Sequence, residues 1–134
     1  PRRLRDMIEA GLVDWVGLDI KALPEHYGQV VGRENAAARA WESLEVLVEA
    51  AGRGGPDFEV RTTVVPGDAT ADDAVEVARR VHAAGARVYA LQQARSEGTS
   101  GEFDVVAPGW DGTCERMAER IEALGWDRFT YRPA

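Results

Sequence analysis

Two residues of opposite charge, Asp19 and Lys21, follow a mostly apolar run and are the first candidates for chemistry. Lys21 is the only lysine among the sixteen Lys and Arg residues of the chain. Strand side chains alternate between two faces, so residues two apart project the same way. Parallel sheets bind ligands at the carboxyl ends of their strands, where lysine offers a compact, mobile ammonium. We therefore expect a ligand contact here; the alternative is a solvated lysine paired with Asp19.

Further polar residues interrupt the apolar runs that follow. Arg61 and Thr63 lie two apart in the second run, and Gln92 lies at the end of the third. A half-buried guanidinium requires an anion to offset its desolvation. Arg61 therefore predicts either a ligand carboxylate or an internal ion pair, with Asp19 or Glu59 as the partner. The residues expected to converge on a ligand are Asp19, Lys21, Arg61, Thr63 and Gln92.

The elements that would position these side chains follow from apolar periodicity and from glycines that end helices. The predicted helices occupy 4–10, 35–51, 70–84 and 112–124, and the predicted strands 12–20, 58–65, 87–93 and 128–132. Asn35 is predicted to cap the second helix, and Thr70 with Asp73 to begin the third. Repeated strand-helix-strand units have right-handed crossovers, which predict an α/β fold with a parallel sheet of about four strands and covering helices.

Composition narrows the class of protein. With 134 residues, the chain is expected to be one domain or one piece of a domain. A hydrophobic content of 45% without a long apolar stretch predicts a soluble, cytoplasmic protein without a membrane span or signal peptide. A net charge of -7 argues against a nucleic-acid partner. The long connection 94–111 predicts a mobile lid, a partner-binding loop or disorder.

Histidine and cysteine give little support for other chemistry. Neither His26 nor His82 lies near a serine or cysteine in a recognisable motif, which argues against nucleophilic catalysis. Cys114 shares a helical stripe with apolar residues and is predicted to be a small buried hydrophobe. As the only cysteine, it excludes an internal disulfide and any multi-cysteine metal or iron-sulfur site built from this chain alone.

Five segments in order resemble the C-terminal portion of the radical S-adenosylmethionine (SAM) activating proteins. These segments are Val13-Asp-Trp-Val-Gly-Leu-Asp-Ile-Lys-Ala22, 27–32, Trp41-Glu-Ser-Leu44, Glu59-Val-Arg-Thr-Thr-Val-Val-Pro66 and Tyr89-Ala-Leu-Gln92. The resemblance is closest to the anaerobic ribonucleoside-triphosphate reductase activating proteins and covers nearly the whole chain. Pyruvate formate-lyase activating enzymes are more distant and share the Asp-x-Lys and Arg…Val-Pro-Gly features.

The resemblance implies an incomplete TIM-like (β/α)6 barrel with SAM lying across the strand tips, bound to a four-iron four-sulfur cluster. By motif match, Lys21 would contact the SAM carboxylate, and Asp19 would orient Lys21 or help to hold a cation. Arg61 would make a second contact to the methionyl part, Thr63 would line the same pocket, and Gln92 matches less specifically. Family members form a 5'-deoxyadenosyl radical that abstracts hydrogen from a glycine of a partner glycyl radical enzyme.

One departure from the family is as informative as the match. The cluster-binding Cys-x-x-x-Cys-x-x-Cys motif does not occur in the sequence, nor does the glycine-rich segment that follows it. We therefore expect residues 1–134 to be the C-terminal portion of a radical SAM domain, inactive alone, which self-associates through an open sheet edge. The alternatives are a non-catalytic interaction module and an unrelated α/β barrel enzyme that binds a small anion, with Lys21 as an amine nucleophile.

Overall fold

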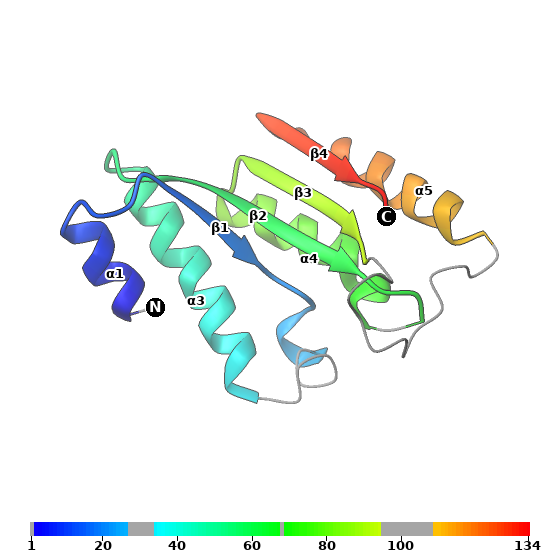
Figure 1. The fold of residues 1–134 in the computed structure, drawn as a ribbon, viewed down its shortest axis with the longest axis horizontal. Coiled ribbons are helices and arrows are strands. Elements are labelled where there is room, and N and C mark those ends of the chain that lie inside the picture. Colours follow the sequence, from blue (N-terminus) through cyan, green and yellow to red (C-terminus); the bar gives the residue numbers. More distant parts are fainter. Residues whose placement is uncertain (1, 27–33, 68, 95–108) are drawn as a thin grey trace.

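The computed structural model describes residues 2–26, 34–67, 69–94 and 109–134. Its strands are β1 (Trp15–Asp19), β2 (Asp57–Val64), β3 (Val88–Gln93) and β4 (Arg128–Arg132). Its helices are α1 (Arg2–Glu9), α3 (Glu34–Ala51), α4 (Ala69–Ala84), α5 (Trp110–Glu122) and a short 3-10 helix, η1 (Pro24–His26). The strands form one parallel sheet in the order β1-β2-β3-β4 (Figure 1). The predicted α/β class, element order and parallel sheet are confirmed.

The core lies between the sheet and the helices α3, α4 and α5, which pack on the same side of the strands (Figure 1). Alternate strand residues point into this core, namely Val16, Leu18, Phe58, Val60, Thr62, Val64, Tyr89, Leu91, Phe129 and Tyr131. The helices contribute buried residues that include Leu44, Leu47, Val77, Val81, Cys114 and Ile121. Since the period-two and helical patterns bury apolar groups against each other, hydrophobic burial holds the two layers together.

A fully buried tyrosine, Tyr89, ties three parts of the core together. Its ring stacks on Trp126 with 4.9 Å between ring centroids. Its hydroxyl lies 2.6 Å from Thr62 Oγ1, which itself donates to the carbonyl oxygen of Ile20 at 2.8 Å. The Tyr89 hydroxyl is therefore the donor to Thr62, and burial raises the pKa of Tyr89 far above its ordinary value. This chain of contacts fixes the segment that leaves β1 against β2 and β3.

Two helix starts differ from the prediction. Asn35 lies inside α3, which begins at Glu34, so it is not the cap. Thr70 and Asp73 lie inside α4, which begins at Ala69. The side-chain oxygen of Thr70 accepts a hydrogen bond from the Val65 amide at 2.9 Å. The Asp73 carboxylate accepts one from the Leu23 amide, which lies 50 residues earlier in the chain. Thr70 and Asp73 thus pair with backbone N–H groups that lie outside α4, where a buried N–H group without a partner would be costly.

Two further elements differ from the prediction. The first strand begins at Trp15, later than the predicted start at residue 12, and η1 was not predicted. Residues 27–33 and 95–108 lie outside the described residues, and with them the 27–32 segment and most of the 94–111 connection.

None of the helices in the described ranges combines the length and apolar character needed to span a bilayer.

Cys114 is fully buried on α5, as predicted. Desolvation raises the pKa of its thiol to about 11, from an ordinary value of 9.0. The folded state holds this proton more tightly than the unfolded chain. The contribution of the thiol to the free energy of unfolding is therefore complete below pH 9 and is lost as the pH rises toward 11. We expect urea unfolding to give a free energy that falls across this window, and Cys114→Ala to reduce the fall. An equal pH dependence in both proteins would contradict this assignment.

Candidate functional site

Polar side chains gather on the sheet face opposite to α3, α4 and α5. Strand register places Asp19 level with Arg61, and Gln92 level with both Thr63 and Arg132. Alternation along each strand therefore puts these residues on one side. We call this set the polar face: Trp15, Gly17, Asp19, Glu59, Arg61, Thr63, Gln92 and Arg132. It brings together four of the five predicted binding residues on adjacent parallel strands, and the fifth, Lys21, follows β1.

Arg61 is held by two neighbours on the polar face. Its Nε donates to Glu59 Oε1 at 2.7 Å, and its guanidinium carbon lies 5.1 Å from the centroid of the Trp15 ring. The Glu59 side chain is only 5% exposed, whereas that of Arg61 is 33% exposed. The predicted internal ion pair with Glu59 is thus present, and the one with Asp19 is not found among the described residues. Glu59 thus accepts from Nε of Arg61, while the described residues provide no acceptor for the two Nη atoms of Arg61.

A second arginine, Arg132, extends the polar face to β4. Its Nη1 lies 3.6 Å from Glu59 Oε1 and donates to Gln92 Oε1 at 3.4 Å. The Gln92 amide in turn donates to Thr63 Oγ1 at 2.9 Å. Sequence reasoning missed Arg132 as a site residue, because its place beside Gln92 depends on the register between β3 and β4. The buried carboxylate of Glu59 is therefore shared by two guanidinium groups.

Lys21 lies just beyond β1, at the edge of the sheet where the carboxyl ends of the parallel strands meet. It is half-buried, while its neighbours Ile20 and Ala22 are fully buried. Neither Lys21 nor Asp19 has an ion pair within the described parts of the chain, so the predicted alternative of a Lys21–Asp19 pair is not observed there. The described residues therefore leave the ammonium of Lys21 without an ion-pair partner, and its N–H groups can donate to an external acceptor.

The charge of the site favours an anion. Lys21 follows β1 and Arg132 ends β4, whereas the Arg61 guanidinium turns back over Gly17 toward Trp15, the first residue of β1. These three positive charges exceed the two negative charges of Asp19 and Glu59. Arginine and lysine donors of this kind bind carboxylates and phosphates through charge-assisted hydrogen bonds.

An iron-sulfur cluster does not fit the residues of this chain. The only cysteine, Cys114, is buried on α5, on the face away from the polar residues. Within the described ranges, no group of three His, Cys, Asp or Glu side chains could hold a metal ion. No step that depends on cluster ligands can therefore be assigned to these 134 residues.

A separate hollow lies at the amino ends of the strands. Its volume is about 650 Å³, and its lining includes Trp15, Phe58, Val88, Arg87 and Asp127. The last two form an exposed ion pair at 3.9 Å. Ligands of open parallel sheets bind at the opposite, carboxyl end. We therefore place the candidate site at the polar face and not in this hollow.

Gly17 leaves the space that the Arg61 guanidinium fills. A Cβ atom at Gly17 would lie 2.9 Å from Arg61 Cζ, so Gly17→Ala must displace the tip of that flexible side chain. We expect the Arg61 Nε–H resonance to move and to exchange with water about tenfold faster as its bond to Glu59 is disturbed. The free energy of unfolding should change by less than about 0.5 kcal/mol.

The matched control is Gly52→Ala, because a Cβ atom there meets only backbone oxygens at 3.5 Å or more. This variant should leave the Arg61 resonance unchanged. An unmoved resonance in Gly17→Ala would show that the guanidinium is not held where the structure places it.

Comparison with known proteins assigns no family to the chain. No protein-family model matches it, and no curated protein matches it.

Proposed function

We propose that the chain is the C-terminal portion of a radical SAM activase, of the type that activates anaerobic ribonucleotide reductase, and that its polar face binds SAM. The observation that carries the proposal is that Asp19, Arg61, Thr63 and Gln92 lie on one face of adjacent parallel strands, with Lys21 two residues beyond the end of β1. These are the residues that the family resemblance selects, and their charge suits the ligand's carboxylate.

The sheet also suits part of a barrel. Purely parallel sheets usually have both faces covered, whereas the described helices cover one face and the other carries polar side chains. In a (β/α) barrel, helices surround the outside and the opposite strand face points inward. An incomplete TIM-like barrel would therefore give the polar face an interior position, with further strands beside β1.

Lys21 and five residues of the polar face have roles in this proposal. Lys21 binds the SAM carboxylate, and Asp19 orients Lys21 or helps to hold a cation beside it. Arg61 donates its Nη atoms to the methionyl part, while Glu59 fixes Arg61 through Nε. Thr63 and Gln92, which bond to each other, line the pocket.

The chemistry needs a component that these residues do not supply. In a radical SAM activase, a reduced four-iron four-sulfur cluster beside SAM would supply the electron for radical chemistry, and Lys21 and Arg61 would hold the methionyl part of SAM. One cysteine cannot hold that cluster, so its ligands would lie outside residues 1–134. The protein partner would be a glycyl radical enzyme such as anaerobic ribonucleotide reductase.

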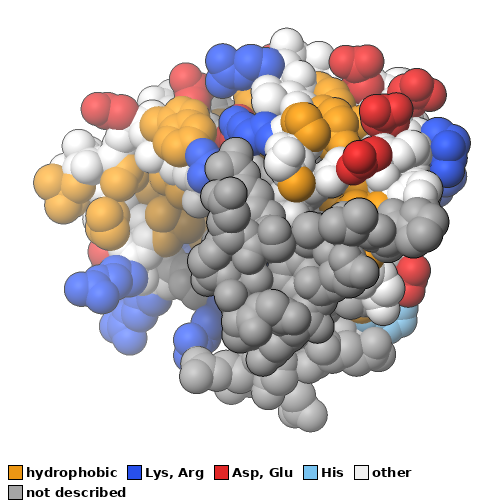
Figure 2. Space-filling view, turned by 45° about the vertical axis from the view of Figure 1, so that its right-hand side comes forward, with side chains coloured by type: hydrophobic (Ala, Val, Ile, Leu, Met, Phe, Trp, Pro, Cys, Tyr) orange, Lys and Arg blue, Asp and Glu red, His pale blue; other side chains and the backbone are white. Residues whose placement is uncertain are grey.

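A surface near β1 suits contact with another polypeptide. The exposed large hydrophobic residues among those described are Met7, Leu12 and Trp15, all before or within this edge strand. Figure 2 shows hydrophobic side chains exposed on the left of that view, above a group of basic side chains. The rest of a barrel, or a second copy of the chain, would cover them.

The proposal is tested by reading the coding sequence upstream of Pro1 in frame. The expected result is three cysteines spaced Cys-x-x-x-Cys-x-x-Cys, which would supply the cluster ligands. A start codon with no such cysteines, in this frame or in a neighbouring gene, would remove the catalytic part of the proposal and leave an interaction module.

A second candidate function follows from the state of Lys21. A half-buried lysine without an ion pair among the described residues could act as an amine nucleophile in an α/β barrel enzyme of another class. Borohydride trapping with a carbonyl substrate would then add mass at Lys21, the chain's only lysine. SAM binding without any such adduct would favour the first proposal.

A further inference from the structure

The backbone around Lys21 is fixed on its β1 side by the neighbouring strand. The Ile20 amide donates to the carbonyl oxygen of Arg61 at 3.0 Å. The carbonyl oxygen of Ile20 accepts a hydrogen bond from Thr62 Oγ1 at 2.8 Å. Both backbone groups before Lys21 are thus paired with β2, which carries Arg61.

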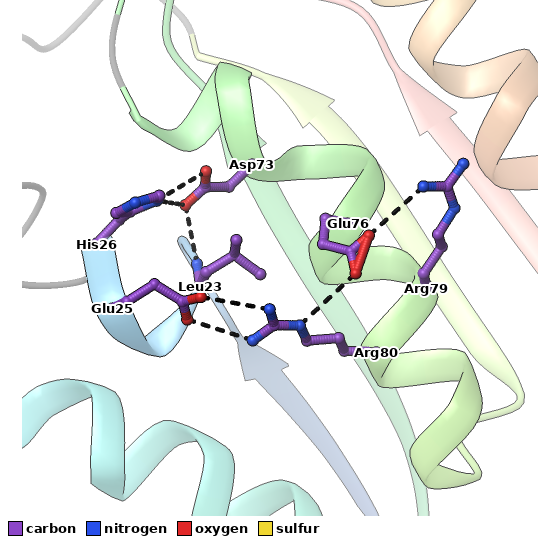
Figure 3. A network of polar contacts seen from close by, with 7 residues as sticks. All are labelled: Leu23, Glu25, His26, Asp73, Glu76, Arg79 and Arg80. Atoms are coloured by element: carbon purple, nitrogen blue, oxygen red, sulfur yellow. Dashed lines mark hydrogen bonds and ion pairs between the residues drawn. The ribbon is translucent and has the colours of Figure 1, made fainter.

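On its other side the segment is fixed by a buried carboxylate of α4. Asp73 Oδ2 accepts a hydrogen bond from the Leu23 amide at 3.0 Å, and both Asp73 oxygens lie 3.0 Å from His26 Nδ1. The Asp73 side chain is 6% exposed. Figure 3 shows the Asp73 carboxylate between the two groups, and Leu23 itself is buried in the core.

A second, exposed contact reinforces the first. Arg80 donates from both Nη atoms to the two oxygens of Glu25, at 3.2 and 3.3 Å. Its Nε lies 3.7 Å from Glu76, one turn earlier on α4 (Figure 3). A bidentate pair of this kind fixes geometry as well as adding energy. The turn after Lys21 is therefore tied to α4 at two points.

We infer that Asp73 is a positioning residue, which holds the 20–26 segment against α4 so that Lys21 points its ammonium at the ligand anion. This inference rests on the proposed role of Lys21 in binding SAM. Lys21 itself makes no ion pair with the described residues, so what the contacts of Ile20 and Leu23 fix is the backbone from which its side chain extends. A lysine whose backbone is held before binding loses less conformational entropy when the ligand arrives.

The test uses Asp73→Ala and Asp73→Asn in the 134-residue chain, with Asp72→Ala as a matched control. Asp72 is the exposed neighbour on the same turn of α4. Three quantities are measured: SAM affinity by calorimetry, hydrogen exchange of the Leu23 amide, and the NMR signal of the single lysine after reductive ¹³C-methylation.

Asp73→Ala should expose the Leu23 amide, speed its exchange about tenfold or more, and weaken SAM binding about tenfold. The methyl signal of Lys21 should sharpen and move toward the position of a free lysine. Asp73→Asn keeps an oxygen that can accept from Leu23, so it should restore SAM affinity to within about threefold. Asp72→Ala should change none of these quantities.

If Asp73→Ala fails to fold, Arg80→Gln replaces it, because this exposed side chain can be changed without burying an unpaired group. The inference then expects SAM binding about threefold weaker at an unchanged unfolding midpoint. A folded variant with native SAM affinity and a native Lys21 signal would overturn the inference.

The proposed function fails separately. If the unsubstituted chain does not bind SAM, or if Lys21→Met binds it equally well, the role of Lys21 is wrong. The positioning of Lys21 by Asp73 is then judged from the NMR signal alone, where a change in Asp73→Ala supports it and no change overturns it.

Discussion

Replacing Lys21 with methionine should weaken SAM binding by about 10- to 100-fold, measured by calorimetry. A hydrogen bond between charged groups is worth about 1.5–3 kcal/mol, and each 1.4 kcal/mol corresponds to a factor of about ten. Methionine keeps the length and apolar stem of lysine but removes the charge. The fold should survive, because the Lys21 side chain is only half-buried and makes no ion pair with the described residues.

Two further variants make this result specific. Arg61→Met should weaken binding by a similar factor, since it removes the second expected contact to the methionyl part. Arg53→Met is the matched control, because Arg53 is a 70% exposed cation paired only with Glu49. Equal losses in all three variants would point to a general effect of net charge and not to a contact at the polar face.

Replacing Tyr89 with alanine should lower the free energy of unfolding by about 3–5 kcal/mol, the usual cost of truncating a buried aromatic residue. The ring is fully buried, stacks on Trp126 and lies 6.4 Å from the centroid of Phe129. A small domain is stable by only about 5–15 kcal/mol. Urea unfolding followed by circular dichroism should therefore show a much lower midpoint.

The hydroxyl of Tyr89 contributes much less than the ring. In Tyr89→Phe, Thr62 still donates to Ile20, so the expected loss is about 1 kcal/mol. If Tyr89→Ala lost no more than Tyr89→Phe, the ring would not occupy the packed position that the structure gives it.

Much of the fold could be predicted from local patterns. Val60 and Val64 alternate with polar residues and are fully buried, and Leu44 and Leu47 share the buried stripe of α3. Such periodicity depends only on backbone geometry and on which face meets the core. The parallel order of the strands then follows from the helices between them.

The prediction failed where a side chain is used by a distant part of the chain. Asp73 has the position of a helix-start residue, yet it pairs with Leu23 and His26, which precede it by 50 and 47 residues. The sequence near Asp73 contains no sign of these partners, because the packing of α4 against the segment after β1 brings them together. Thr70 differs, because its oxygen accepts from the Val65 amide only five residues earlier, just after β2.

The candidate site was predicted in part. Asp19, Arg61 and their neighbours could be placed on one face because alternation within a strand is readable from sequence. Arg132 and Trp15 could not be assigned to the site in the same way, because their proximity to Glu59 and Arg61 depends on register between strands. Such register is set by packing across the whole sheet.

The central claim, that Lys21 and the polar face together bind SAM, is tested most directly by NMR of the single lysine. Reductive ¹³C-methylation gives one lysine side-chain signal, because Lys21 is the only lysine. We predict a saturable shift of this signal on titration with SAM, and a much weaker shift with decarboxylated SAM or in Arg61→Met. A Lys21 signal that stays unmoved at saturating SAM would contradict the claim.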